Sequence, residues 1–131
     1  MLTGKKIVLG VSGGIAAYKM ANVASMLSKL HADIHVVMTE NATHFITPET
    51  FEVLTGNHCY TDTFDRCMEL HVPHIALGTQ ADAILIAPAS ADVVGKIANG
   101  IADDMLTTCV LPATCPVMLA PSMNVHMYEN P

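Results

Sequence analysis

Basic side chains are scarce in this sequence. It contains 6 Lys and Arg residues against 12 Asp and Glu residues, which gives a formal net charge of −6. Proteins that bind nucleic acids rely on Lys and Arg to neutralise phosphates, and anionic membrane surfaces attract clusters of the same residues. The composition therefore excludes a basic binding face and argues against nucleic acid or anionic lipid as a partner.

Long apolar runs and metal-binding spacings are also missing. The runs at Ile7–Val11 and Ala83–Ala87 are far shorter than the roughly 20 residues that span a bilayer, and no leader of charged and then apolar residues opens the chain. These features predict a cytoplasmic protein with no membrane segment. The 4 cysteines show no C-x-x-C spacing, and the pair His71 and His74 has no carboxylate or cysteine at ligand spacing. We therefore expect reduced thiols and no metal.

Apolar residues, by contrast, make up 51% of the chain. Its 131 residues suit one domain, and we expect residues 1–131 to form a single unit. Continuously apolar runs that are separated by helical patterns predict a parallel sheet covered on both faces. The sequence thus predicts a three-layer, doubly wound α/β fold. The expected strands are Lys5–Val11, Ala32–Glu40, Ala81–Ser90 and Cys115–Ser122, with a weaker one near Cys59–Tyr60.

Two helices are indicated clearly between these strands. Apolar residues recur at helical spacing from Ala17 to Leu30. Thr47 followed by Pro48 is typical of a helix start, and Gly56 is typical of a helix end.

Small and polar residues follow each expected strand, where ligands bind in open α/β sheets. The segment Gly10–Gly14, GVSGG, fits neither G-x-G-x-x-G nor a Walker A loop. Its Ser12 hydroxyl and the N–H groups at a helix N-terminus could hold one phosphate without a cation, which suits a mononucleotide. Alternatively, Gly13 and Gly14 only make a tight turn. The other three loops favour a ligand.

Single residues elsewhere are ambiguous when taken alone. His74, taken alone, is more typical of a helix start or a core position than of a catalyst. Met118, Met123 and Met127 are typical core residues as well as candidate site residues.

Four ordered motifs together carry a family resemblance: GVSGGIAAYK, PHIAL, APASADVVGKIANGIADDMLTT and PSMNVHMY. In this combination the chain resembles the flavin-dependent cysteine decarboxylases, and most closely the phosphopantothenoylcysteine decarboxylases of coenzyme A synthesis. The resemblance covers essentially the whole chain. It implies a flavodoxin-like (Rossmann-like) fold that binds FMN at the contact between subunits, in a homotrimer or a homododecamer built of trimers.

The resemblance also implies roles for particular residues. The catalytic histidine falls on His74, and the P-x-M-N-x-x-M-[WY] motif places Asn124 at the carboxylate of a small-molecule substrate, with Met127 shaping the pocket. At Asp92 this chain has an acidic residue where the family has an amide. The implied FMN contacts are Gly10, Ser12, Gly13, Thr39, Phe45, Ser90, Ala91, Asp92, Ser122 and Met123.

The implied activity is oxidative decarboxylation of the cysteine moiety of phosphopantothenoylcysteine, with FMN as cofactor. Family members continue into a substrate clamp whose cysteine supplies the final proton, whereas this sequence ends at Pro131. We therefore expect either a fragment or a turnover that stops before the last step.

Rival functions remain open at this point. One is a peptidyl-cysteine decarboxylase of the same family, and another is a flavin-binding regulatory subunit without turnover. A flavin prenyltransferase is disfavoured because the only arginine is Arg66. An electron-transfer flavodoxin would leave His74 and Asn124 without roles.

Overall fold

The protein is built on a four-stranded parallel sheet with strand order β2-β1-β3-β4. The computed structural model describes residues 1–64 and 73–131. The four predicted strands are confirmed, each shorter by one to three residues at its ends. They are β1 (Lys6–Val11), β2 (Asp33–Met38), β3 (Ala83–Ala89) and β4 (Val117–Pro121).

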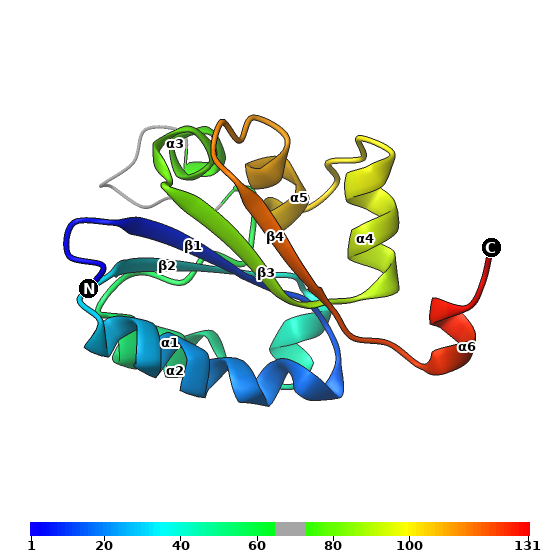
Figure 1. The fold of residues 1–131 in the computed structure, drawn as a ribbon, viewed down its shortest axis with the longest axis horizontal. Helices are drawn as coiled ribbons and strands as arrows, with labels where there is room; N and C mark the ends of the chain where they lie inside the picture. Colours follow the sequence, from blue (N-terminus) through cyan, green and yellow to red (C-terminus); the bar gives the residue numbers. More distant parts are fainter. Residues whose placement is uncertain (65–72) are drawn as a thin grey trace.

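Helices lie on both faces of this sheet, which confirms the predicted three-layer α/β fold (Figure 1). The first face carries α1 (Met20–Lys29) and α2 (Pro48–Thr55). The opposite face carries α3 (Pro73–Gln80), α4 (Ala91–Ala98) and α5 (Met105–Val110). A last short helix, α6 (Val125–Tyr128), projects beyond the end of β4.

Local sequence signals explain where α2 begins and ends. Thr47 is its N-cap with extended backbone, Pro48 occupies the first helical position, and Gly56 adopts a left-handed conformation with φ 74°. A residue without a Cβ adopts that conformation at little cost, so the helix ends there. The predicted bounds of α2 are confirmed. The other predicted helix is in part a 3₁₀ turn, because η1 (Ile15–Lys19) precedes α1.

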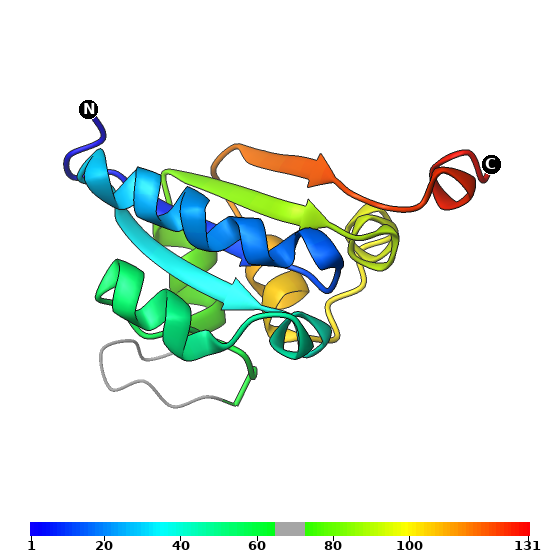
Figure 2. The same cartoon turned by 90° about the horizontal axis from the view of Figure 1, so that it is seen from below.

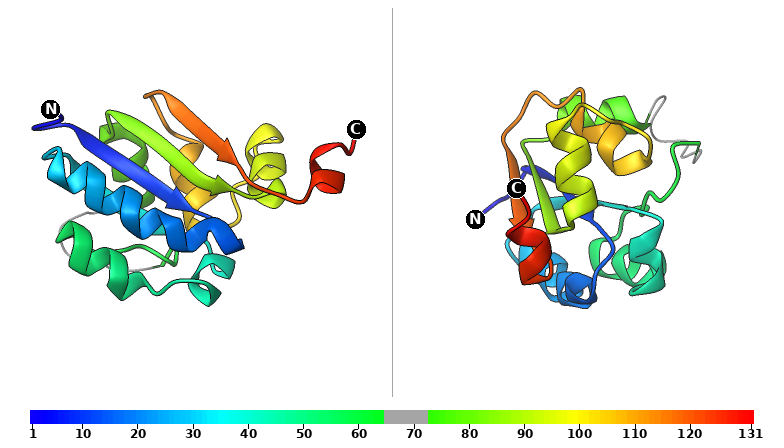
Figure 3. Two further views of the ribbon diagram at one scale, coloured as in Figure 1. Left: turned by 60° about the horizontal axis from the view of Figure 1, so that its bottom comes forward. Right: turned by 90° about the vertical axis from the view of Figure 1, so that its right-hand side faces the viewer.

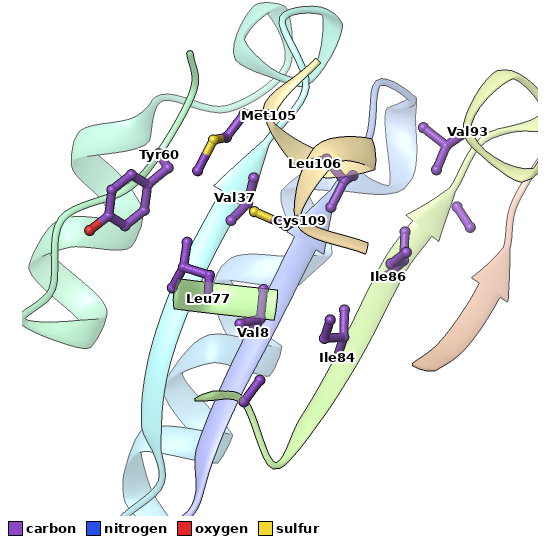
Figure 4. Close-up of a cluster of buried hydrophobic side chains, with 12 residues drawn as sticks. Val8, Val37, Tyr60, Leu77, Ile84, Ile86, Val93, Met105, Leu106 and Cys109 are labelled. Atoms are coloured by element: carbon purple, nitrogen blue, oxygen red, sulfur yellow. The ribbon is translucent and has the colours of Figure 1, made fainter. Parts of the chain in front are cut away.

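Alternate residues of the central strands supply two buried clusters, one on each face of the sheet. Val8, Ile84 and Ile86 pack with Leu77 of α3 and Leu106 of α5 (Figure 4). Leu9 and Val36, among others, point to the opposite face and pack with residues of α1 and α2. Because both faces are covered, the strands are continuously apolar.

Helices α3 and α5 approach each other unusually closely at Gly78. A Cβ on this residue would lie 2.4 Å from the backbone oxygen of Cys109. A glycine in mid-helix normally costs stability relative to alanine. Here it allows the two helix backbones to touch.

Two expectations about strands are wrong in detail. The weak strand near Cys59–Tyr60 is reduced to a single bridge between Tyr60 and Val37. The fourth strand is not covered on both faces, since Met118 is 53% and Leu119 39% exposed. Figure 2 shows the reason: α1 and α2 lie over β1 and β2, and neither reaches β4 at the sheet edge.

Candidate functional site

The loops after all four strands meet at the carboxyl edge of the sheet. In Figure 3 the strand arrows point toward the end of the molecule that carries η1, α4 and α6. This is the place where open parallel sheets bind ligands. The prediction that these loops converge is therefore confirmed.

One cavity at this edge, of about 440 Å³, joins the loops after β1, β2 and β3. Half of its lining consists of residues predicted for the site. These are Gly13, Thr39, Ser90, Ala91, Asp92 and Met127.

A second cavity of about 440 Å³ joins the loops after β1 and β3 to the β4–α6 segment. It shares Gly13, Ser90, Ala91 and Met127 with the first cavity, so the two adjoin along the same loops. The second cavity is also lined by Ser122, Met123 and Asn124, which were predicted for the site as well. Nine predicted residues thus line one composite depression.

Ser12 holds the loop after β1 to the loop after β3. It is completely buried, its hydroxyl donates to the Pro88 carbonyl, and the same oxygen accepts the N–H of Ser90 at 2.9 Å. The Ser12 N–H also donates to the Pro88 carbonyl, at 3.3 Å. These bonds occupy the hydroxyl that the sequence suggested for a phosphate, and its direct contact with a ligand stays a prediction.

Ser90 starts α4 and leaves donors at the cavity. Its hydroxyl accepts the N–H of Val93 at 3.3 Å as the N-cap. Within the described part of the chain, the N–H groups of Ala91 and Asp92 have no acceptor, and neither do those of Gly13 and Gly14. Two sets of unpaired N–H groups at one cavity form a cradle for an anion.

Close backbone approach shapes the other wall of the first cavity. A Cβ on Gly13 would lie 2.5 Å from Cβ of Asn41, the first residue of η2 (Asn41–His44). Thr39, which is 7% exposed, accepts the N–H of Ala42 through its hydroxyl at 3.2 Å. The loop after β2 is thereby fixed against the loop after β1.

Carboxylates outnumber cations around the first cavity. Glu40, Asp92, Asp103 and Asp104 line it together with Lys96. The Lys96 ammonium lies 3.1 Å from Asp92 and 3.2 Å from Asp103. These hydrogen bonds, that of Asp92 foremost, raise the pKa of Lys96. Lys96 is therefore already paired with these two carboxylates. The backbone N–H groups are the donors that remain available to a phosphate.

Asn124 has a structural task in addition to its predicted one. Its Oδ1 accepts the N–H of His126 at 2.8 Å, which caps α6. Asn is a favoured N-cap residue, so the position before VHMY was a readable capping signal. The Asn124 side-chain NH₂ group has no acceptor among residues 1–64 and 73–131, and it remains able to donate to a ligand.

Besides Ser12, three predicted residues are placed away from these cavities. Gly10 lies inside β1, where a Cβ would meet Cδ1 of Leu106 at 2.5 Å, so packing explains the glycine. Phe45 is 51% exposed after η2 and lines neither cavity.

The third, His74, lies in the first turn of α3. The His74 side chain lies outside the described part of the structure. Helix α3 and helix α6 lie at opposite ends of the molecule in Figure 1. One chain therefore does not bring the backbone of His74 to Asn124.

Sequence reasoning assigned no role to four charged residues of the first cavity, which are Glu40, Lys96, Asp103 and Asp104. Asp104 caps α5, where its carboxylate accepts the N–H of Thr107 at 2.8 Å in a capping box. Asp103 and Lys96 form the ion pair described above. An acidic pair immediately before a helical pattern was the available signal for the cap.

Residues 1–64 and 73–131 show no sign of two other site types. No helix there is both long and apolar enough to cross a bilayer. No group of three or more His, Cys, Asp or Glu side chains there is arranged to hold a metal ion.

A parallel sheet of flavodoxin-like topology, with an N–H-lined depression at its carboxyl edge, defines a mononucleotide-binding α/β domain. Residues 1–131 match the family model described as Flavoprotein. The chain belongs to this flavoprotein family.

Curated relatives include the coenzyme A biosynthesis bifunctional protein CoaBC of Bacillus subtilis (strain 168), which is 50% identical over 131 residues. The match covers 100% of this chain and 32% of that protein. CoaBC of Mycolicibacterium smegmatis is 44% identical, with 100% and 31% covered. The chain thus spans about a third of the length of these relatives.

Solved structures support the same family. The FMN-dependent cysteine decarboxylase SpaF superimposes with a TM-score of 0.91 at 37% identity, and the match covers 100% of this chain and 75% of that chain. A PPC decarboxylase mutant complexed with pantothenoylaminoethenethiol gives 0.82 at 32% identity, with 97% and 71% covered.

Proposed function

We propose that the protein is the FMN-dependent decarboxylase of phosphopantothenoylcysteine and yields phosphopantetheine in coenzyme A biosynthesis. The observation that carries this proposal is the composite depression, which places the Asn124 amide beside loops with unpaired N–H groups. The similarity to CoaBC and to the PPC decarboxylase complex supports this substrate.

The residues of the depression fit FMN. An unpaired N–H cradle at Gly13, Gly14, Ala91 and Asp92 suits a phosphate monoester without a cation. Apolar lining from Met123 and Met127 suits a planar aromatic ring. Gly13, Thr39, Ser90, Ala91, Asp92, Ser122 and Met123 would hold the cofactor. The predicted contacts of Gly10 and Phe45 stand as proposals that the cavities do not support directly.

When bound, FMN would supply the oxidation and reduction chemistry that makes the cysteine moiety able to lose CO₂. The Asn124 NH₂ group would donate to the substrate carboxylate. An amide does this without a positive charge that would hold the electrons on the carboxylate and oppose CO₂ loss. Met127 would bound the pocket, and His74 would act as the general acid/base of the oxidation.

A complete site requires more than one copy of the chain. Helix α3, which carries His74, lies at the opposite end of the molecule from α6, which Asn124 caps. The exposed apolar residues of β4 and α6 offer the surface for such contacts. We propose a homotrimer, or a dodecamer built of trimers, in the cytoplasm, with His74 of one copy facing Asn124 of another.

Two measurements test these proposals. The purified protein should show the visible absorption of a flavin and release CO₂ from phosphopantothenoylcysteine. Protein that neither carries flavin nor takes up added FMN would contradict the cofactor and the activity together.

Subunit mixing tests the shared site separately. His74→Asn and Asn124→Asp should each abolish CO₂ release while FMN stays bound. When the two variants are co-expressed with different tags, random mixing within trimers leaves about a quarter of sites intact, so partial activity should return. Inactive mixed assemblies would contradict a site shared between copies.

A second candidate is a peptidyl-cysteine decarboxylase, which the similarity to SpaF favours. CO₂ release from a peptide with a C-terminal cysteine, but not from phosphopantothenoylcysteine, would support this alternative.

A further inference from the structure

We propose that Ser12 is a positioning residue of the cofactor site: its buried hydroxyl locks the start of α4 in place and does not contact FMN. The inference rests on the proposed function for the identity of the ligand. It assigns Ser12 a different role from the phosphate contact that the family resemblance implies.

Burial carries the first step. Ser12 is completely buried, whereas the next residue, Gly13, lines both cavities. Ser12 itself is not among the residues that line either cavity. A ligand in the depression therefore meets the backbone of the β1 loop at Gly13 and not the Ser12 hydroxyl.

Hydrogen bonding carries the second step. The Ser12 hydroxyl donates its proton to the Pro88 carbonyl, and its oxygen accepts the Ser90 N–H at 2.9 Å. A hydroxyl has one proton to donate, and that of Ser12 is already bound to Pro88. The hydroxyl therefore has no proton left to donate to an anion.

The third step connects this clasp to the cavity. Ser90, whose N–H Ser12 holds, caps α4 by accepting the Val93 N–H. The two residues between them, Ala91 and Asp92, carry N–H groups without acceptors in the described chain. Ser12, 78 residues before Ser90 in the sequence, thus fixes the direction of the Ala91 and Asp92 N–H groups although it does not itself contact the ligand.

The test compares Ser12→Ala with the parent protein and with a matched control, Ser28→Ala. Ser28 is also a serine that bridges two segments, since its hydroxyl donates to the Leu54 carbonyl at 3.2 Å between α1 and α2. Two quantities are measured: amide hydrogen exchange of residues 89–93 in the flavin-free protein, and the dissociation constant for FMN.

We expect Ser12→Ala to speed exchange at residues 89–93 before any flavin is added, because the Ser90 N–H loses its acceptor. The dissociation constant for FMN should rise roughly tenfold or more. Ser12→Thr, which keeps a hydroxyl, should restore both quantities toward the parent values. Ser28→Ala should change neither.

Two outcomes would overturn the proposal. Weaker FMN binding with unchanged exchange in the flavin-free protein would make Ser12 a direct ligand of the cofactor. Faster exchange with unchanged FMN affinity would make the clasp purely structural. Failure of the parent protein to bind FMN is a different result, because it would contradict the proposed function itself. Should the Ser12→Thr chain not fold, the comparison of Ser12→Ala with the parent still decides among these outcomes.

Discussion

The carboxyl edge of the sheet has two unlike halves. The loops after β1 and β3 are tied together by buried hydrogen bonds through Ser12, and the strands behind them are covered on both faces. The β4–α6 segment carries equally important residues, yet Met118, Met127 and Tyr128 are more than half exposed. One half of the site is thus organised within the chain, while the other half is exposed where the proposed trimer would bring a neighbouring copy.

The largest loss of stability is expected from a substitution at Gly78, in the part of the molecule where the sheet is covered on both faces. Gly78→Ala places a Cβ 2.4 Å from the Cys109 carbonyl oxygen, a backbone atom that cannot rotate away. We expect the free energy of unfolding in urea to fall by about 3 kcal/mol, as is typical of overpacking. Gly95→Ala in α4 is the control, because nothing lies within 4 Å of its new Cβ. Helix propensity should make that variant about 0.5–1 kcal/mol more stable.

Gly13→Ala should break the same half at the ligand end. The new Cβ would lie 2.5 Å from Cβ and 3.1 Å from the carbonyl carbon of Asn41, so the loops after β1 and β2 must separate. We expect FMN to bind at least about tenfold more weakly in a fluorescence titration, since overpacking costs typically exceed 1 kcal/mol. Unchanged affinity would show that the close approach to Asn41 does not matter for the cofactor. Gly95→Ala again serves as the control.

Met118→Lys tests the uncovered half. Its side chain is 53% exposed in the single chain, so within one subunit the substitution should change the free energy of unfolding by no more than about 0.5 kcal/mol. Sedimentation should nevertheless show a shift from trimer to monomer if β4 lies in the contact. Val53→Lys on α2, where the side chain is 85% exposed, should leave the assembly intact. Identical sedimentation of both variants and the parent would place the contact elsewhere.

Asp92→Asn should have the smallest effect. The carboxylate is 67% exposed and pairs with Lys96, and such surface pairs contribute less than about 1 kcal/mol. Because the pair raises the pKa of Lys96, its stabilisation is present below the unfolded-state pKa and is lost as pH rises through the folded-state pKa. As the pH is raised from roughly 9 to 12, the free energy of unfolding in urea should therefore fall less for the variant than for the parent. Equal losses would show that the pair does not contribute.

The sequence predicted the covered half far better than the uncovered half. Apolar runs such as Ala83–Ala89 and the Thr47-Pro48 helix start depend on local patterns, and both were found. The exposure of β4 could not be predicted in this way, because its residues are as apolar as those of β3. What separates the two strands is the position at the sheet edge, which is a property of topology.

Site residues divide along a similar line. Loops that follow strands could be predicted as site positions, and Gly13, Ser90 and Ala91 do line the cavities. The reason why a particular residue type occupies its position could not be predicted from the sequence. Gly10 is a glycine because Leu106, nearly 100 residues away, packs against it, and Ser12 is a serine because it meets Pro88 and Ser90.

The close packing of α3 on α5 has a chemical consequence for the Cys109 thiol beneath it. Burial, with the nearby charge of Asp104 as the lesser cause, raises the pKa of Cys109 to about 12. Only the thiolate reacts readily with peroxides or alkylating reagents, so at neutral pH Cys109 is held almost entirely in its unreactive thiol form. A flavoprotein core that holds its sulfur in this form resists the oxidants that flavins generate in air. Among the cysteines of the described chain, the partly exposed Cys115 is then the position at which such damage, or a thiol-specific label, should first be found.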